Sequence, residues 1–166
     1  MRNAGAAAAA ASLLVLVFAA QITRAVDDNS SVLQLTSQNW NKARDDNRLY
    51  VVKFYIDHCG HWYVFSERTT NTLTLTACLH ARVRSKRLAP IWERLGATYS
   101  GDERTVIATV DCGIEQSICR SMDVQAFPAV RAISGGVVRR EFKGARELSE
   151  LRQFIRVVER DLGLAE

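Results

Sequence analysis

The chain has 166 residues, of which 48% are hydrophobic and 24% are charged. This length and composition suit one globular domain with a buried core and exclude a disordered or fibrous chain. The formal net charge of +4 comes from 22 basic and 18 acidic residues that are mixed along the sequence. That mixture excludes the concentrated basic patch of a nucleic-acid-binding protein.

The beginning of the chain is typical of a secretory signal peptide. Arg2 precedes an apolar run over residues 6–20, which is too short to span a membrane comfortably. Thr23 and Ala25 place small residues at positions −3 and −1 of a cleavage site. We therefore expect residues 1–25 to be removed, and we expect no membrane segment in the mature chain.

A secretory route gives meaning to two further features. Asn29 begins an Asn-Ser-Ser glycosylation sequon, and residues 163–166 form a tail without an endoplasmic-reticulum retention signal. The cysteines can form disulfides in such a compartment; they are Cys59, Cys78, Cys112 and Cys119. We expect the protein in the lumen of the endoplasmic reticulum or outside the cell.

The first predicted elements are a short strand over residues 32–35 and a helix that Thr36 or Ser37 can cap. Residues 49–55 follow as a strand rich in β-branched and aromatic side chains. That strand is almost continuously apolar, as a central strand should be, and Lys53 interrupts it.

The next predicted helix covers residues 86–99, with a kink at Pro90. Its apolar residues recur at helical spacing; they are Leu88, Ile91, Trp92 and Leu95. A buried strand over residues 105–110, a short helix over 115–122 and a strand over 129–133 follow.

Gly135-Gly136 predict a hairpin turn into a strand over residues 137–142. A final amphipathic helix over 145–162 carries an apolar stripe of Leu148, Leu151, Phe154, Ile155 and Val158. Helices alternate with strands, and a hairpin and a helix end the chain. This order predicts an α/β domain with a central mixed sheet flanked by helices on both faces.

Cys59-Gly60-His61-Trp62 follows the predicted central strand directly. A Cys-x-x-Cys redox motif stands in this position in thioredoxin-like proteins, because two intervening residues let both sulfurs meet at a helix start. Here Trp62 stands where the second cysteine would be. The sequence as written therefore carries half of a thiol–disulfide exchange site.

The chain resembles the protein disulfide isomerase family, whose domains have the thioredoxin fold. The resemblance covers residues 31–160 apart from 62–85, which gives a thioredoxin domain over 26–162. An additional cysteine pair, formed by Cys112 in Val110-Asp111-Cys112 and by Cys119, resembles that of thioredoxin-domain proteins of the endoplasmic reticulum. The matching segments are Lys53-Phe54-Tyr55 with Cys59-Gly60-His61, Lys86-Arg87-Leu88-Ala89-Pro90-Ile91-Trp92-Glu93, Val110-Asp111-Cys112 with Cys119, Phe127-Pro128, and Phe142-Lys143-Gly144-Ala145-Arg146.

The resemblance implies roles for several residues. Cys59 would be the attacking thiol, and a protonated His61 or His58 would stabilise its thiolate. A cis bond between Phe127 and Pro128 would leave neighbouring backbone groups free to pair with an extended peptide substrate. No cofactor is implied.

Cys112 and Cys119 are interpreted as a structural disulfide, with buried free thiols as the alternative. A metal site is not expected, because no nearby histidine or further cysteine completes four ligands.

Departures from the family pattern concern the same region. Asp57-His58 replace Pro-Trp, and Lys53 occupies a position often held by a buried carboxylate. Residues 62–85 form an atypical, irregular insertion with weak strand-like alternation over 69–76. Cys78 could replace the missing thiol only if this segment folded back.

The genetic code offers an origin for the insertion. The codons of Trp62-Tyr63-Val64 can contain an intron start, and the Ser85 codon can contain an intron end. Excision would remove a number of bases divisible by three and would join TG to C, a cysteine codon. The result would read Cys-Gly-His-Cys-Lys-Arg-Leu-Ala-Pro. We interpret the segment as a retained intron; a genuine functional insertion is the alternative.

Function follows from these features as a set of hypotheses. The first is a thiol–disulfide oxidoreductase or isomerase that acts on cysteines of folding client proteins in the secretory pathway. Glutathione or an oxidase would restore it. The alternative is a redox-inactive or monothiol thioredoxin-fold module that binds clients like a chaperone. A trapping role for Cys59 alone is a third possibility.

Overall fold

The computed structural model describes residues 30–57 and 72–164. The predicted signal peptide, the sequon asparagine Asn29 and the motif residues Cys59, His61 and Trp62 lie outside these described residues. No helix within them is long and apolar enough to cross a membrane.

A five-stranded mixed sheet forms the centre of the domain, as predicted. Its strands lie in the order β1-β3-β2-β4-β5. β1 and β2 both pair with β3 in parallel, whereas β4 is antiparallel to β2 and β5 is antiparallel to β4. The strands are β1 (Leu33–Gln34), β2 (Leu49–Tyr55), β3 (Thr105–Asp111), β4 (Ala129–Ser134) and β5 (Val137–Glu141).

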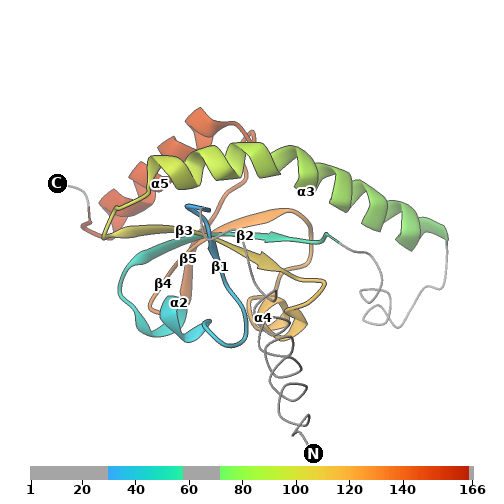
Figure 1. The fold of residues 1–166 in the computed structure, drawn as a ribbon, viewed down its shortest axis with the longest axis horizontal. Helices are drawn as coiled ribbons and strands as arrows, with labels where there is room; N and C mark the ends of the chain where they lie inside the picture. The colour runs from blue at the N-terminus through green and yellow to red at the C-terminus, as the bar shows by residue number, and fades with distance from the viewer. Residues whose placement is uncertain (1–29, 58–71, 165–166) are drawn as a thin grey trace, which may run out of the picture.

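Helices cover both faces of the sheet (Figure 1). α3 and α5 lie on one face, and α2 and α4 lie on the other. The helices are α2 (Asn41–Asp45), α3 (Thr72–Thr98), α4 (Gln116–Ser121) and α5 (Leu148–Asp161). This arrangement confirms the predicted α/β architecture and gives the domain two apolar layers.

The two layers contain the residues that the apolar patterns indicate. Under α3 and α5 the buried side chains include Val51, Leu88, Trp92, Leu95, Leu151 and Ile155. On the opposite face they include Tyr50, Phe54, Val110, Ile118, Val124 and Phe127. The Trp92 indole Nε1–H donates a 3.1 Å hydrogen bond to the Ala108 carbonyl, which fixes α3 to β3.

The predicted start of the long helix is wrong. α3 begins at Thr72 rather than at residue 86, so the part of the insertion over residues 72–85 is helical and not irregular. No glycine or proline occurs between residues 72 and 89, and nothing in that run interrupts helical hydrogen bonding. The helix continues through Pro90. In Figure 1 its amino-terminal part extends beyond the sheet.

Smaller differences occur at other element ends. The first predicted strand is reduced to two paired residues, and the helix expected from Thr36 or Ser37 begins only at Asn41. The backbone N–H of Trp40 instead donates to the Thr36 carbonyl at 2.9 Å and closes a turn. The last helix begins at Leu148 rather than at residue 145. Such ends depend on local hydrogen bonds that periodicity does not resolve.

The backbone requires glycine at the turn between β4 and β5 and at one position in α3. Gly135 and Gly136 have φ values of 59° and 72°, which the turn between β4 and β5 requires. Gly96 lies where α3 passes the start of β1. A Cβ atom there would lie 2.5 Å from Val32 Cγ2 and 3.2 Å from the Ser31 carbonyl oxygen, so a side chain would require movement.

Candidate active site

Three strand ends meet at one edge of the sheet. Tyr55 at the end of β2 is paired with Asp111 at the end of β3, and Phe54 is paired with Ala129 at the start of β4. The Cys112 backbone N–H donates to the Tyr55 carbonyl at 2.8 Å and extends this contact. Because β2 and β3 are parallel and β4 is antiparallel, residues far apart in sequence come together here.

Phe127 and Pro128 lie at this edge, immediately before β4. Both residues are buried, and the peptide bond between them is cis. The Arg146 guanidinium donates from Nη2 to the Pro128 carbonyl oxygen at 3.2 Å. The structure thus places the two predicted substrate-binding residues beside the end of β2.

The chain reaches the Cys59 segment from the same edge. Ile56 is buried and Asp57 is partly exposed, and they are the last described residues before the gap. Cys59 and His61 follow in the sequence. The roles predicted for Cys59 and His61 therefore remain predictions. The last described residue before them, Asp57, follows the end of β2 at the edge where Pro128 and the end of β3 lie.

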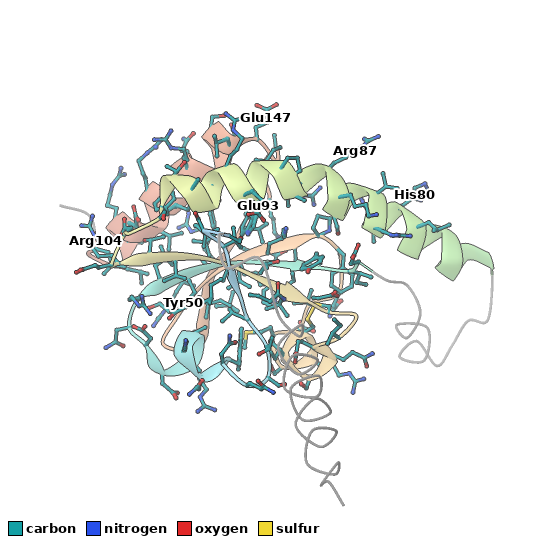
Figure 2. The ribbon with its side chains drawn as sticks, viewed as in Figure 1. Tyr50, His80, Arg87, Glu93, Arg104 and Glu147 are labelled. Carbon is teal, nitrogen blue, oxygen red and sulfur yellow. A yellow bond between two sulfur atoms is a disulfide. The ribbon has the colours of Figure 1, made fainter. Side chains whose placement is uncertain are left out.

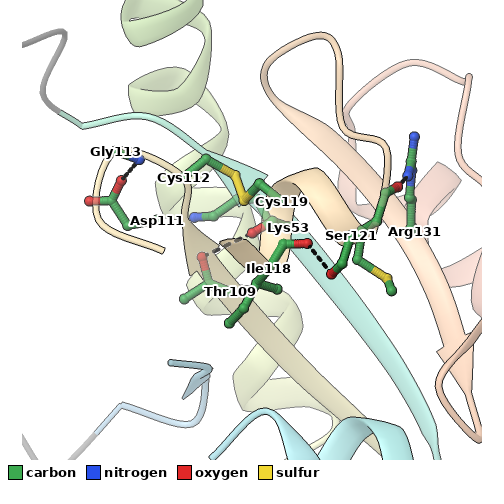
Figure 3. Close-up of a disulfide and its surroundings, with 10 residues drawn as sticks. Lys53, Thr109, Asp111, Cys112, Gly113, Ile118, Cys119, Ser121 and Arg131 are labelled. Carbon is green, nitrogen blue, oxygen red and sulfur yellow. Dashed lines mark hydrogen bonds between the residues drawn. A yellow bond between two sulfur atoms is a disulfide. The ribbon is translucent and has the colours of Figure 1, made fainter. Parts of the chain in front are cut away.

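Cys112 and Cys119 form a disulfide with an S–S distance of 2.00 Å and a Cα–Cα distance of 5.8 Å. Figure 3 shows this bond joining the end of β3 to α4. Both cysteines are fully buried. The Asp111 carboxylate accepts a 2.8 Å hydrogen bond from the Gly113 backbone N–H within the same loop. The disulfide therefore fixes the segment beside Tyr55.

Lys53 is a buried cation in the middle of the sheet, with only 5% of the residue exposed. Its Nζ lies 5.0 Å from the Tyr55 ring centroid and 5.7 Å from the Trp92 ring centroid, where the aromatic faces attract a cation. Burial lowers the pKa of Lys53, and the Glu93 carboxylate opposes that effect. At the position where the sequence comparison above expected a buried carboxylate, the chain thus has a buried lysine flanked by aromatic rings.

Tyr55 next to this lysine is also electrostatically perturbed. Burial and the nearby carboxylates of Asp111 and Asp57 raise the pKa of Tyr55 to about 12, although a hydrogen bond with Gln34 opposes the shift. The phenol is therefore neutral at physiological pH. It can donate or accept a hydrogen bond at this edge but cannot supply an anion.

Sequence reasoning did not identify Glu93 or Tyr55 as part of the Lys53 environment. Glu93 is on α3, and its proximity depends on how that helix crosses the sheet. A signal for Tyr55 was available, because residues two apart in a strand face the same side. Within residues 30–57 and 72–164, no group of three histidine, cysteine or acidic side chains could hold a metal ion.

Comparisons with known proteins agree with this fold. Residues 83–157 match the model of the thioredoxin family. The chain is 23% identical over 144 residues to protein disulfide isomerase-like 5-1 of Oryza sativa subsp. japonica, covering 86% of this chain and 82% of the relative. It is 30% identical over 134 residues to protein disulfide isomerase-like 2-1 of the same organism, covering 80% of this chain and 30% of that protein.

A solved structure also has the same fold. The J-Trx1 fragment of ERdj5 superposes with a TM-score of 0.61 at 21% identity, covering 84% of this chain and 55% of the fragment. The chain thus spans most of one rice relative and about a third of the other. The sheet order and the superposition show that the chain has a thioredoxin fold, and its sequence is similar to protein disulfide isomerase-like proteins over most of its length.

Proposed function

We propose that the chain is a thiol–disulfide oxidoreductase that acts on cysteines of folding client proteins, with Cys59 as its nucleophile. One observation carries the proposal. The buried central strand β2 ends at the sheet edge where β3 ends and where Phe127 and Pro128 lie, and Cys59 follows that strand in sequence. Similarity to protein disulfide isomerase-like proteins supports the same chemistry.

The exchange begins with attack of the Cys59 thiolate on one sulfur of a client disulfide. A mixed disulfide forms, and the other client sulfur leaves as a thiolate. A protonated His61 would favour the Cys59 thiolate before attack. In the family pattern a second cysteine then attacks Cys59 and releases the client as a dithiol, leaving a disulfide in the enzyme.

Trp62 cannot perform that second step. Two molecules of glutathione can complete it instead. The first thiolate attacks the Cys59 sulfur and releases the client thiol, and the second attacks the Cys59–glutathione disulfide and leaves oxidised glutathione. The client disulfide is reduced and two glutathione molecules are oxidised, so electrons balance. Oxidised glutathione would run the cycle in the opposite direction, forming a client disulfide from a client dithiol and returning two molecules of glutathione, which an oxidase would reoxidise.

The compartment is part of the proposal. The predicted signal peptide over residues 1–25 and the sequon at Asn29 support entry into the secretory pathway. The buried Cys112–Cys119 disulfide is the kind of bond that persists in such an oxidising compartment. Detecting a glycan on Asn29 after expression in secretory cells tests this route, and an unmodified cytosolic product contradicts it.

We also propose that residues 62–85 derive from a retained intron, which would separate Cys59 from its resolving thiol. The codon arithmetic at Trp62 and Ser85 supports this origin. Sequencing of full-length transcripts tests it. We expect a dominant message in which one cysteine codon replaces residues 62–85, and a dominant uninterrupted message would overturn the idea.

Activity is tested on the chain as written and on a form in which a single cysteine replaces residues 62–85. We expect insulin reduction and refolding of scrambled ribonuclease to be much faster with the shortened form. In the shortened form, Cys59→Ser should abolish both reactions. In the chain as written, which still contains Cys78, Cys78→Ser is the control for exchange by that second thiol. Equal activity in the shortened form and its Cys59→Ser variant would refute the proposed nucleophile.

Trp62 favours a second candidate, a monothiol module that holds clients without turnover. Cys59 would then form client adducts that only an external thiol releases. Non-reducing gels of the chain as written should show adducts that disappear with Cys59→Ser. If neither form has exchange activity and client binding survives Cys59→Ser, a redox-inactive binding module is the better description.

A further inference from the structure

A groove separates α3 from the β1–β3 edge of the sheet. Its volume is about 1070 Å³. Residues of β2, α3 and β3 form part of its lining; they include Lys53, Tyr55, Ser85, Ala89, Glu93 and Thr109. None of the described residues that line the groove has a role in the thiol chemistry proposed above.

One row of α3 faces this groove. Ser85, Ala89 and Glu93 are four residues apart and therefore lie above one another on the same side of the helix. Figure 2 shows Glu93 on the side of α3 that faces the sheet and Arg87 on the opposite side. This row therefore presents the small apolar residue Ala89 between two polar residues, Ser85 and Glu93.

The lining of the groove includes Lys53, a basic side chain that is almost fully buried. Lys53 lines it while remaining 95% buried, and aromatic rings of Tyr55 and Trp92 flank its ammonium group. A buried ammonium loses hydration, so an anion that pairs with it gains more than it would at the surface. The groove provides the space from which such an anion can approach.

A second polar group of the lining, the Ser85 hydroxyl, lacks a hydrogen-bond partner within the described residues. The Ser85 residue is 5% exposed, and its Oγ forms no hydrogen bond with any part of the chain that the structure describes. A buried hydroxyl without a partner is unfavourable. Rotation of this side chain about its Cα–Cβ bond would turn the hydroxyl without moving the helix.

The remaining charges of the lining limit the ligand's charge. Lys86 adds one cation, whereas Asp57, Glu93 and Asp102 are acidic. These three carboxylates repel a dianion such as phosphate more strongly than a monoanion, so the lining favours a ligand with one negative charge, which would share Lys53 with the Glu93 carboxylate. The lining also contains apolar residues, interspersed with polar ones, that suit a ligand with an apolar body; they include Leu33, Ala89, Val106 and Ile107.

We propose that this groove binds a small organic carboxylate, with the carboxylate between the Lys53 ammonium and the Ser85 hydroxyl. The two carboxylate oxygens can accept one hydrogen bond from each donor at the same time. The apolar body of the ligand lies along Ala89 and the β3 edge.

Benzoate is the probe for this site, and the neutral analogue benzamide and inorganic phosphate are the comparisons. Titration of the isotope-labelled full chain at pH 7 should move the backbone amide signals of Ala89 and Thr109. We expect benzoate to bind at least about tenfold more tightly than either comparison ligand, as loss of a charged hydrogen bond implies. Equal binding of benzamide or phosphate would overturn the proposal.

Two variants locate the carboxylate. Lys53→Met should weaken benzoate binding at least about tenfold, and Ser85→Ala about threefold. Lys143→Met removes an exposed lysine outside the groove and should change the affinity by less than about twofold. Wild-type affinity in Ser85→Ala together with unmoved Ala89 and Thr109 signals would reject this site even if Lys53→Met does not fold.

Discussion

The two ends of α3 have opposite relations to the rest of the domain. Leu88, Trp92 and Leu95 in the carboxyl-terminal part are at most 1% exposed, because they pack on the sheet and on α5. Nearer the amino terminus, Leu79 and Val83 are 47% and 50% exposed, and Ala81 is buried. One continuous helix thus contains a part that the fold requires and a part that contributes little apolar burial.

This difference shows that a segment can be helical without contributing much to the stability of the domain. Local hydrogen bonding and the absence of glycine and proline are enough to continue a helix. Burial of an apolar face decides whether that helix stabilises the domain. Substitutions in the two parts of α3, at the disulfide and at Lys53 should show how much each contributes to the free energy of unfolding.

The largest effect is expected for Trp92→Ala. Trp92 is fully buried, and its indole N–H is bonded to the Ala108 carbonyl. Loss of the ring and the hydrogen bond should reduce the free energy of unfolding by about 3–5 kcal/mol. Urea denaturation followed by fluorescence and circular dichroism measures this. A loss near that of an exposed position would contradict the role assigned to this part of α3.

The next effect should come from the Cys112–Cys119 disulfide, which provides a covalently fixed region for comparison with the helix. Replacing both cysteines by alanine removes a crosslink between residues seven apart. The loop-entropy relation gives a loss of about 2–3 kcal/mol. The comparison is the denaturation midpoint of this double variant against that of the oxidised wild type. A midpoint unchanged by the substitutions would show that α4 packs equally well without the bond.

Lys53→Met should raise stability at neutral pH, on the order of 1 kcal/mol, because an apolar side chain replaces a buried charge. The pKa of Lys53 is lowered from 10.5 in the folded protein, so unfolding takes up a proton between the two pKa values. The destabilising effect of the charged lysine is complete below the folded pKa and disappears above 10.5. The advantage of the variant should therefore shrink as pH rises toward 10.5.

Measuring wild type and Lys53→Met in parallel from pH 7 to pH 11 isolates this effect. The tyrosines with raised pKa values, Tyr50, Tyr55 and Tyr99, titrate in both proteins, and only the Tyr55 contribution can change with its neighbour. A stability difference that stays constant over this range would mean that Lys53 is not destabilised as a cation in the fold.

The smallest effect is expected for Val83→Ser in the exposed part of α3. Half of Val83 is exposed, so the substitution should change the free energy of unfolding by less than about 0.5 kcal/mol. The same denaturation assay applies, with Trp92→Ala as the opposite extreme. A loss above about 1 kcal/mol would show that the amino-terminal part of α3 is held by contacts beyond those of the described side chains.

Periodicity predicted most of the fold. The bounds of β2 were predicted at residues 49–55, and the apolar stripe of α5 is buried at Leu151, Phe154, Ile155 and Val158. These predictions succeed because one buried face imposes a repeat on the sequence. The start of α3 was missed because alternating threonines before Cys78 resemble a strand, whereas hydrogen bonding along the chain decides the helix.

The candidate site was predictable only in part. The sequence indicated Phe127, Pro128 and the two cysteines Cys112 and Cys119. Their meeting at the end of β2 depends on parallel and antiparallel register between distant strands. The Lys53 environment was predictable only for Tyr55, two residues along the same strand, because the position of Glu93 follows from the way α3 crosses the sheet and not from its sequence spacing.

Gly96 permits a short distance between the backbone of α3 and the residues just before β1. The backbone of α3 lies against Val32 and Ser31 so closely that even a methyl group would contact the Val32 side chain at 2.5 Å. Those two residues also line the groove. A residue larger than glycine would therefore push α3 and the segment before β1 apart, and the lining of the groove would change at Ser31 and Val32. The clearance available to a ligand at Lys53 is thus set partly by a residue that has no side chain.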